Sequence, residues 1–416
     1  MTQQHTSAKP AAQTPRSLRA RAWELLVKPI GEPAPAPPGL TATTVLLIAS
    51  LAAVWRMTIL IVTVAWARLG IANPWEGAGE LRQLLRHSVH WDSGWYLTVI
   101  RDGYSYNPEA QSNIAFFPAF PYLTRLFDWL LPGNEVFAGL LVVHLAFFGA
   151  LLYIYQLVRI DYPDDAAWRA LFFLLIFPAA FFFSAFYAES LIIFGMAGAL
   201  YHARRGQWLL AGLFGMFTGL TKLIGLILIV PLMLEMLRQG AIQRFNLRAW
   251  AGAGMTLAGG AGYLAYLHVW LGDFRVYFWN QEHWNRTSFD PEPFIQFFQY
   301  LTGGDLGYLE YPARMTELYS FYFLIDVGSL LVFLAAGVYL WVRVLPSYGA
   351  LVLAGALVPA LSGAPIAMAR HMAILFPVFI LAGRVQSEPI RNAIAVAAVF
   401  GLGMTAFLFV NGYWAG

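Results

Sequence analysis

Apolar runs of membrane-spanning length recur along most of this chain, and they constrain its fold more than any other feature. A bilayer is crossed by about 20 consecutive apolar residues in a helix, and the first run, from Leu40 onward, is ~30 residues long. Only 12% of the 416 residues are charged, whereas a soluble domain carries about 25%. The chain therefore cannot cover a water-facing surface, and we expect an all-α polytopic membrane protein.

The apolar runs predict about eleven transmembrane helices. Single helices are expected at 41–70, 136–158, 249–271, 318–343, 348–362, 365–384 and 390–411. Coupled pairs are expected at 169–203 and 207–237, which are short for two crossings each. We expect these paired helices to be short or broken, and to be buried in protein or to line a cavity. Small residues at 252–262 predict close helix packing there.

Arginines set the expected orientation, because basic residues favour cytoplasmic loops. They gather at one set of predicted helix ends: Arg159, Arg169, Arg204, Arg205, Arg238, Arg244, Arg248, Arg343, Arg384 and Arg391. The basic, proline-rich tail at 1–40 should therefore be cytoplasmic, and 41–416 should form one transmembrane domain. Two long segments, 72–134 and 272–317, then lie outside. We expect a multi-pass protein of the cell membrane in a prokaryote, or of the endoplasmic reticulum in a eukaryote.

The charge balance and the cysteine count exclude several classes of function. The net charge is +3 and the basic residues are scattered between apolar runs, which favours the positive-inside rule over nucleic-acid binding. The chain has no cysteine, so it has no disulfide, no thiolate metal site and no cysteine nucleophile. No cofactor is indicated and no compact set of histidines and acids stands out, although a divalent metal is left open.

Charged residues inside the predicted spans are candidates for function, because burying them in a membrane is expensive. Glu189, Lys222, Asp326 and Arg370 with His371 all fall toward the external ends of their helices. This coincidence predicts one polar site at the external face, assembled from several helices. The alternative is that each charge simply reaches the interface on a flexible side chain.

The first external segment carries the strongest catalytic candidate, Asp92, within H-S-V-H-W-D-S-G-W-Y. A carboxylate just beyond a long helix can meet a membrane-bound substrate and act as a general base toward a sugar hydroxyl. Its neighbours His90, Trp91, Trp95 and Tyr96 are candidates for substrate contact, and the aromatic ones equally suit an interfacial belt. Asp102 is a second acid, in a sequence that also suits a turn.

Four stretches, in order across about residues 85–380, resemble motifs of the PIG-V (phosphatidylinositol-glycan class V) mannosyltransferase family. They read H-W-D-S-G-W-Y-L-T-V-I-R-D-G-Y with A-F-F-P-A-F-P, F-P-A-A-F-F-F-S-A-F-Y-A-E-S-L, G-L-T-K-L-I-G-L and A-M-A-R-H-M-A-I-L-F-P-V-F. Two positions depart from the family pattern, since His90 and Lys222 stand where arginine is usual. Lysine offers a phosphate a point charge in place of a bidentate fork.

The resemblance implies a GT-C-type glycosyltransferase fold with interfacial helices in its long first external loop. It implies an inverting enzyme that takes mannose from a polyprenyl- or dolichyl-phosphate donor at the extracytoplasmic face, with Asp92 as the general base. A phosphate leaving group needs cations, for which Lys222 and Arg370 are the best candidates, with His371 assisting. Glu189 is expected to bind a sugar hydroxyl or to orient a cation, and Tyr187 beside it is a further candidate for substrate contact.

The second external segment holds two more candidate residues, and two other classes of protein remain as alternatives. Glu282 and His283, among aromatic residues, are candidates for an acceptor-side wall or an interfacial belt. The acceptor itself is left open, as a glycolipid, a glycan or a protein. A lipid-linked glycan flippase would also bury charges, but its two halves usually repeat, and we find no repeat here. A polymer ligase on the same scaffold is the other alternative.

Overall fold

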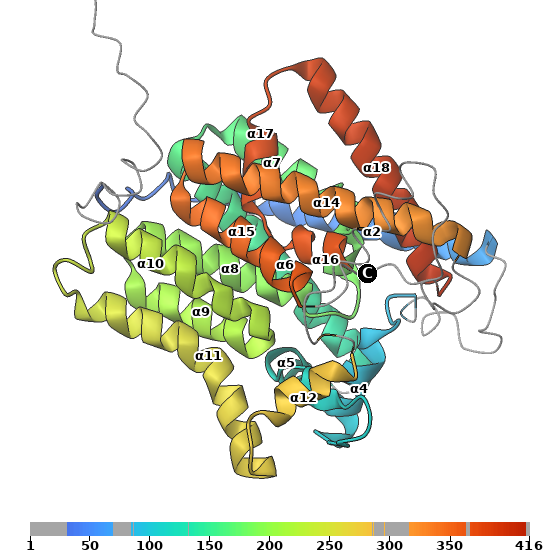
Figure 1. The fold of residues 1–416 in the computed structure, drawn as a ribbon. Helices are drawn as coiled ribbons and strands as arrows, with labels where there is room; N and C mark the ends of the chain where they lie inside the picture. The colour runs from blue at the N-terminus through green and yellow to red at the C-terminus, as the bar shows by residue number, and fades with distance from the viewer. Residues whose placement is uncertain are drawn as a thin grey trace, which may run out of the picture.

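The computed structural model describes residues 31–69, 85, 87–131, 133–284, 286, 295, 316–362 and 367–412. Every regular element in these ranges is a helix, as the sequence predicts (Figure 1). Most of the predicted cytoplasmic tail, residues 1–30, lies outside the described residues, and so do parts of both external segments.

Four helices in the described part are long and apolar enough to cross a membrane. They are α2 (Ala42–Leu69), α6 (Glu135–Asp161), α14 (Thr316–Arg343) and α18 (Glu388–Val410). The other predicted spans contain α7 (Asp164–Leu175), α8 (Glu189–Arg204), α9 (Trp208–Thr221), α10 (Ile229–Arg238), α11 (Leu247–Leu271), α15 (Pro346–Ala360), α16 (Met368–Ala373) and α17 (Pro377–Gly383). The integral membrane character is confirmed, and the number of about eleven crossings stays a prediction.

Both predicted helix pairs are short and interrupted, as their lengths indicated. Between α7 and α8 the chain passes through η2 (Ala180–Ser184), a 3₁₀ segment that follows Pro178. Between α9 and α10 it passes through η3 (Leu223–Leu228), after Lys222 adopts an extended backbone. Proline cannot continue a helix, and extended backbone breaks the helical hydrogen-bond ladder. The two breaks place polar side chains at the ends of α8 and α9.

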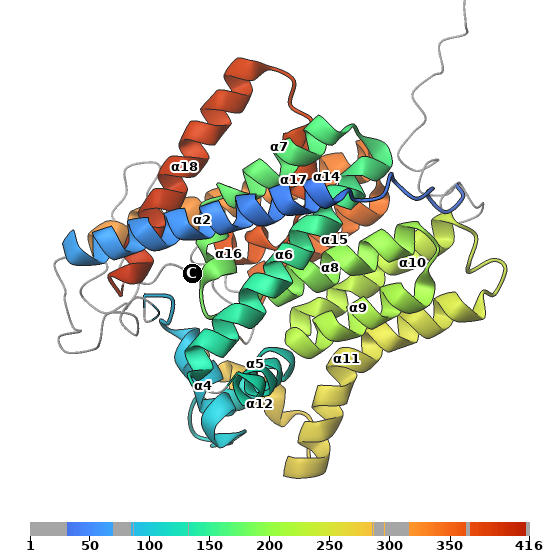
Figure 2. The same cartoon turned by 180° about the vertical axis from the view of Figure 1, so that it is seen from behind.

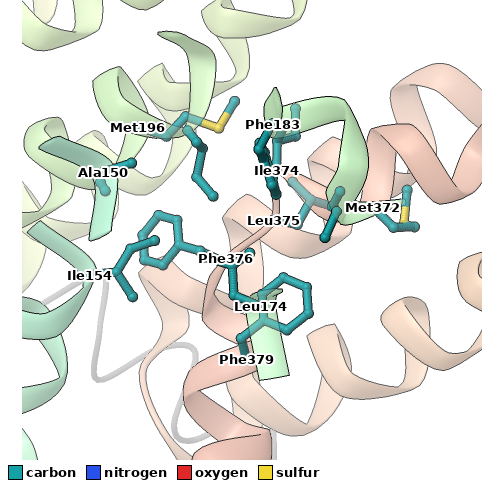
Figure 3. Close-up of a cluster of buried hydrophobic side chains, with 14 of the residues drawn as sticks. Ala150, Ile154, Leu174, Phe183, Met196, Met372, Ile374, Leu375, Phe376 and Phe379 are labelled. Carbon is teal, nitrogen blue, oxygen red and sulfur yellow. The ribbon is translucent and has the colours of Figure 1, made fainter. Parts of the chain in front are cut away.

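The main hydrophobic core surrounds these broken segments. Figure 3 shows Phe183 of η2 and Met196 of α8 facing Phe376, which lies between α16 and α17. Phe183 also stacks on Phe147 of α6, with ring centroids 4.8 Å apart. Apolar burial and aromatic stacking both stabilise this region, and the surrounding side chains enclose the irregular backbone of η2.

Helices α9 and α11 lie side by side along the upper half of α11 (Figures 1 and 2). Glycines form the contact: a Cβ at Gly212 would stand 2.5 Å from the Cα of Gly252, and one at Gly252 would stand 2.2 Å from the carbonyl oxygen of Trp208. No larger side chain fits between the two backbones without moving them. The predicted small-residue packing at 252–262 is therefore present, and α9 is its partner.

The far ends of α8 and α10 are joined by a buried polar network. Arg204 pairs with Asp161 and stacks over the ring of Tyr348, whose hydroxyl accepts a hydrogen bond from Nη1 of Arg204 at 3.3 Å. Glu235, which is fully buried, accepts hydrogen bonds from Arg238 and from the Ser347 hydroxyl. Buried charges of this kind are tolerated because each has partners. This network lies away from the candidate site described next.

Two helices of the first external segment are α4 (Asp92–Asp102) and α5 (Ala119–Leu130). Phe120 on one face of α5 is buried against Tyr96 of α4 and Phe186, whereas Trp129 on α5 is 75% exposed. Such a two-sided helix suits an interface between protein, lipid headgroups and water. A third short helix, α12 (Val276–Glu282), lies beside them and belongs to the second external segment (Figure 1).

Candidate active site

The loop that carries Asp92 is fixed by hydrogen bonds to the segment before α8. The Tyr187 hydroxyl donates to the carbonyl oxygen of His90 at 2.7 Å, and the Ser93 hydroxyl donates to that of Phe186 at 3.1 Å. Between these two anchors Trp91 has a φ of 52° and a ψ of −113°, a conformation that non-glycine residues rarely adopt. The anchors thus hold a strained turn directly before α4, so that Asp92 becomes the first residue of the helix.

A buried ion-pair network connects Asp92 with Glu189 and Arg370. Arg370 on α16 donates from Nη1 to Oδ2 of Asp92 at 2.7 Å and from Nε to Oε1 of Glu189 at 2.6 Å. The Arg370 and Glu189 side chains are only 5% and 2% exposed, whereas that of Asp92 is 20% exposed. One guanidinium therefore pairs with two carboxylates, and of the two only Asp92 keeps access to solvent.

Lys222 completes the network beside the break between α9 and η3. Its Nζ lies 3.6 Å from Oε1 of Glu189, and its side chain is 24% exposed. The 3.6 Å distance is longer than a hydrogen bond, so the attraction of Lys222 to Glu189 is electrostatic and no hydrogen bond joins these two atoms. Lys222 is thus better placed than Arg370 to meet an incoming anion.

The pKa of the Asp92 carboxyl is set by two opposing effects. Burial by itself would raise this pKa, but the charge and the hydrogen bond of Arg370 lower it, with smaller contributions from Lys222 and Arg286. The lowering effects prevail, so the pKa of Asp92 lies below its ordinary value and the side chain is ionised at neutral pH. Burial raises the pKa of Tyr96 well above its ordinary value, which keeps that phenol neutral.

Arg370 is also held by aromatic rings from the segment before α8. Its Cζ lies 4.4 Å from the centroid of the Tyr187 ring and 5.1 Å from that of Phe182. Cation–π contacts of this kind stabilise a buried guanidinium. Tyr187 therefore touches both halves of the ion pair, Arg370 through its ring and the Asp92 loop through its hydroxyl.

Two cavities meet at this network. The smaller has a volume of about 60 Å³ and is lined by Asp92, Tyr96, Ala115, Phe116, Phe117, Thr221, Lys222, Tyr277, Gln281, Trp284, Arg286 and Arg370. The larger has a volume of about 650 Å³, and its lining is mostly apolar, from η3, α11, α12 and α15, with His371 and Glu282 at its polar parts. Lys222, Tyr277, Gln281 and Arg286 line both. The two cavities therefore adjoin at a cationic junction next to Asp92.

The structure brings most of the charged candidates together, as the sequence suggests. Asp92, Tyr96, Arg370, His371 and Glu282 each line one of the two cavities, and Lys222 lines both. Glu189 and Tyr187 are buried behind them and line neither cavity.

The remaining candidates are not among the residues that line either cavity. His90 packs on edge against Phe409, and Trp95 packs against Phe116 and Trp284. Trp91 is 41% exposed. Asp102 is exposed at the last turn of α4, and a ring nitrogen of His283 contacts the carbonyl oxygen of Pro108. These contacts are with protein atoms and leave the cavity walls to other residues.

Sequence reasoning did not single out four residues that line the small cavity beside Asp92, namely Thr221, Tyr277, Gln281 and Arg286. Arg286 was visible only as one of several charges in an aromatic stretch, and Gln281 is a common polar residue. Tyr277, Gln281 and Arg286 line both cavities, and their position depends on the packing of α12 against α11 and the 3₁₀ turn η1 (Asn113–Ala115). Among the described residues, no group of three histidines or acids is close enough to hold a metal ion.

The sequence matches the family described as Mannosyltransferase (PIG-V) over residues 45–248, slightly less than half of the chain. Three of the four motif stretches lie inside this range, so the match confirms the family resemblance drawn from them. No curated protein matches the sequence. The enzyme class predicted from the motifs is confirmed as well: the protein is a membrane glycosyltransferase.

The solved structures that resemble this fold are distant in sequence. ArnT from Cupriavidus metallidurans, crystallised with undecaprenyl phosphate, has a TM-score of 0.52 and 16% identity, over 90% of this chain and 77% of that one. The oligosaccharyltransferase of Archaeoglobus fulgidus in the apo form has a TM-score of 0.41 and 16% identity, over 87% of this chain and 56% of that one. The likeness to ArnT supports the predicted GT-C-type fold.

Proposed function

We propose that this glycosyltransferase moves mannose from a polyprenyl- or dolichyl-phosphate donor to an acceptor hydroxyl at the extracytoplasmic face, with inversion at the anomeric carbon. The observation that carries the proposal is the position of Asp92. It is an ionised carboxylate at the wall of a small polar cavity, which adjoins a large apolar cavity at a cationic junction. A lipid-phosphate donor and a hydroxyl acceptor need this combination of surfaces.

The donor fits the larger cavity and the junction. The apolar lining from η3, α11 and α15 suits a prenyl chain, and Lys222 and Arg286 at the junction suit its phosphate. Arg370 already has two carboxylate partners, so its main role is to hold Asp92 and Glu189, and its contribution to the phosphate is through charge. His371, in the wall of the larger cavity, is placed to donate a hydrogen bond to the phosphate. The bound undecaprenyl phosphate of ArnT supports a donor of this class.

The reaction then needs one proton transfer and one displacement. The acceptor oxygen attacks the anomeric carbon while its proton passes to Oδ of Asp92, and the bond from the anomeric carbon to the phosphate oxygen breaks. The leaving polyprenyl phosphate gains negative charge, which Lys222 and Arg286 stabilise from the junction. Attack opposite to the leaving group inverts the anomeric centre. The acceptor is a hydroxyl of a glycolipid, a glycan or a protein.

A transfer assay tests this function directly. Purified protein in nanodiscs is given radiolabelled polyprenyl-phosphate-mannose and a panel of membrane glycolipid, glycan and protein acceptors, and labelled product is counted. We expect transfer by the wild type and a loss of kcat of at least 100-fold in Asp92→Asn, because general bases contribute about 10²–10⁴-fold. Lys222→Gln should raise the donor KM and retain the fold. Near-normal turnover of Asp92→Asn would refute Asp92 as the base, and transfer from a nucleotide sugar alone would refute the donor class.

A further inference from the structure

Asp326 is the one buried charge among the sequence candidates that lies on α14, away from both cavities. Its side chain is almost fully enclosed. Oδ2 accepts the backbone N–H of Ala367 at 2.9 Å, and Oδ1 accepts that of Ala369 at 2.8 Å. Both donors belong to the start of α16, the short helix that carries Arg370. The carboxylate is therefore joined to this stretch of backbone by two hydrogen bonds.

Helix α16 needs stabilising contacts from other elements, because it is short and its N-terminus has no side-chain cap of its own. It has six residues, and isolated helices of this length are unstable in water. Its N-cap residue, Ala367, supplies no side-chain hydrogen bond and has a φ of 63°, which is unfavourable for alanine. The first N–H groups of a helix need acceptors. Asp326 supplies two of them from a neighbouring helix, and its negative charge also suits a helix N-terminus.

We propose that Asp326 is a positioning residue: by capping α16 from α14, it fixes the guanidinium of Arg370 between Asp92 and Glu189. Helix α14 packs against α16 (Figures 1 and 2). Arg370 is the third residue of α16, one position after Ala369, so a shift of the capped turn moves Arg370 directly. Its two ion pairs, at 2.7 and 2.6 Å, leave little tolerance for such a shift.

This role rests on the proposed function for its effect on catalysis, but its structural half is measurable without any substrate. Loss of the cap should loosen Arg370 and thereby change the titration of Asp92. Other groups that interact with Asp92 come from several elements and are expected to stay in place in an Asp326 variant: Lys222, Arg286, Tyr96 and Tyr187. Glu189 shares Arg370 with Asp92. A changed titration midpoint therefore reports on Arg370.

The experiment uses Asp326→Asn, which replaces one acceptor oxygen by an amide N–H₂ group facing a backbone N–H. Protein labelled with ¹³C at aspartate carboxyls is titrated in micelles without substrate, and the Asp92 signal is identified by its absence in Asp92→Asn. We expect the Asp92 midpoint to rise in Asp326→Asn and to return toward the wild-type value in Asp326→Glu, which keeps both acceptors. Glu235→Gln is the matched control, because Glu235 is an equally buried carboxylate in the far network; it should lower stability and leave the Asp92 midpoint unchanged.

The transfer assay tests the effect of Asp326 on catalysis. In Asp326→Asn, kcat per folded molecule should fall roughly 10- to 100-fold with a smaller change in donor KM, since a displacement of about 1 Å can cost 100-fold. An unchanged Asp92 midpoint in folded Asp326→Asn, or an equal shift in Glu235→Gln, overturns the positioning role. If Asp326→Asn does not fold, Asp326→Glu decides: a midpoint and kcat like those of the wild type support the role, and values like those of Arg370→Gln overturn it. Absence of transfer in the wild type would refute the proposed function while leaving the midpoint test valid.

Discussion

Tyr187→Phe is the perturbation that best separates catalysis from folding at this site. The Tyr187 hydroxyl donates one hydrogen bond of 2.7 Å to the carbonyl oxygen of His90, while the ring supports Arg370 at 4.4 Å. Phenylalanine keeps the ring and removes only the hydroxyl. The carbonyl of His90 keeps the N–H of Ser93 as a donor, so no buried group is left unpaired. The variant therefore loosens the strained turn at Trp91 that places Asp92, with little other damage.

The expected loss of kcat in Tyr187→Phe follows from the loss of a single hydrogen bond. Its net contribution is about 0.5–1.5 kcal/mol. If all of it holds the Asp92 turn in its reactive position, kcat falls by about 2- to 13-fold, since 1.36 kcal/mol corresponds to a factor of ten in rate. The free energy of unfolding falls by the same amount. The donor KM should change little, because Tyr187 lines neither cavity.

Tyr348→Phe provides a matched control. Tyr348 is also fully buried, its ring lies under Arg204, and its hydroxyl takes part in one hydrogen bond, but it belongs to the far network. The assay measures kcat per folded molecule, with thermal unfolding in detergent as the measure of stability. We expect similar losses of stability in both variants and a loss of kcat only in Tyr187→Phe. Equal kcat values in the two variants would refute the reasoning that Tyr187 positions Asp92.

Two further predictions concern pH and packing. The base acts when it is deprotonated, and the pKa of Asp92 lies below the ordinary value of an aspartate, so wild-type kcat/KM should be retained as the pH falls toward that ordinary value. In Arg370→Gln the effect of burial is opposed by Lys222 and Arg286 alone, so the pKa rises and the acid limb of the pH profile moves upward; an unmoved limb would argue against the ion pair. Gly252→Ala places a Cβ 2.2 Å from a backbone oxygen of α9 and should lower the free energy of unfolding by about 1–3 kcal/mol, measured as a lower Tm. Gly254→Ala is the control, because a Cβ there has nothing within 4 Å, and it should not lower Tm. Equal Tm values in the two variants would mean that α9 and α11 are not packed in this way.

Much of the architecture was predictable because it depends on local composition. Each apolar run contains helix, and the two runs too short for their pairs of spans contain helices interrupted at η2 and η3. Glycines at 252–262 indicated close packing, since small residues serve little other purpose in an apolar helix. The number of crossings did not follow with equal certainty, because short helices such as α16 and α17 need not traverse a bilayer.

The sequence predicted the main charged residues of the candidate site, but not their contacts with one another. Motif resemblance and membrane charge together selected Asp92, Glu189, Lys222 and Arg370, and the structure joins all four. Sequence reasoning assigned Arg370 mainly to a phosphate. The structure shows that it is already shared by two carboxylates and that Arg286 stands at the junction of the cavities with Lys222.

Hydropathy and short motifs are properties of neighbouring residues, so they were enough to predict a helical membrane glycosyltransferase. The pairing of the charges depends on the tertiary structure, since Arg370 meets carboxylates 278 and 181 residues away in the chain. The same holds for Asp326, which reads as an intramembrane charge in the sequence and acts as a helix cap in the fold. The cost of burying a charge demands a partner, but the packing of helices distant in sequence chooses which one.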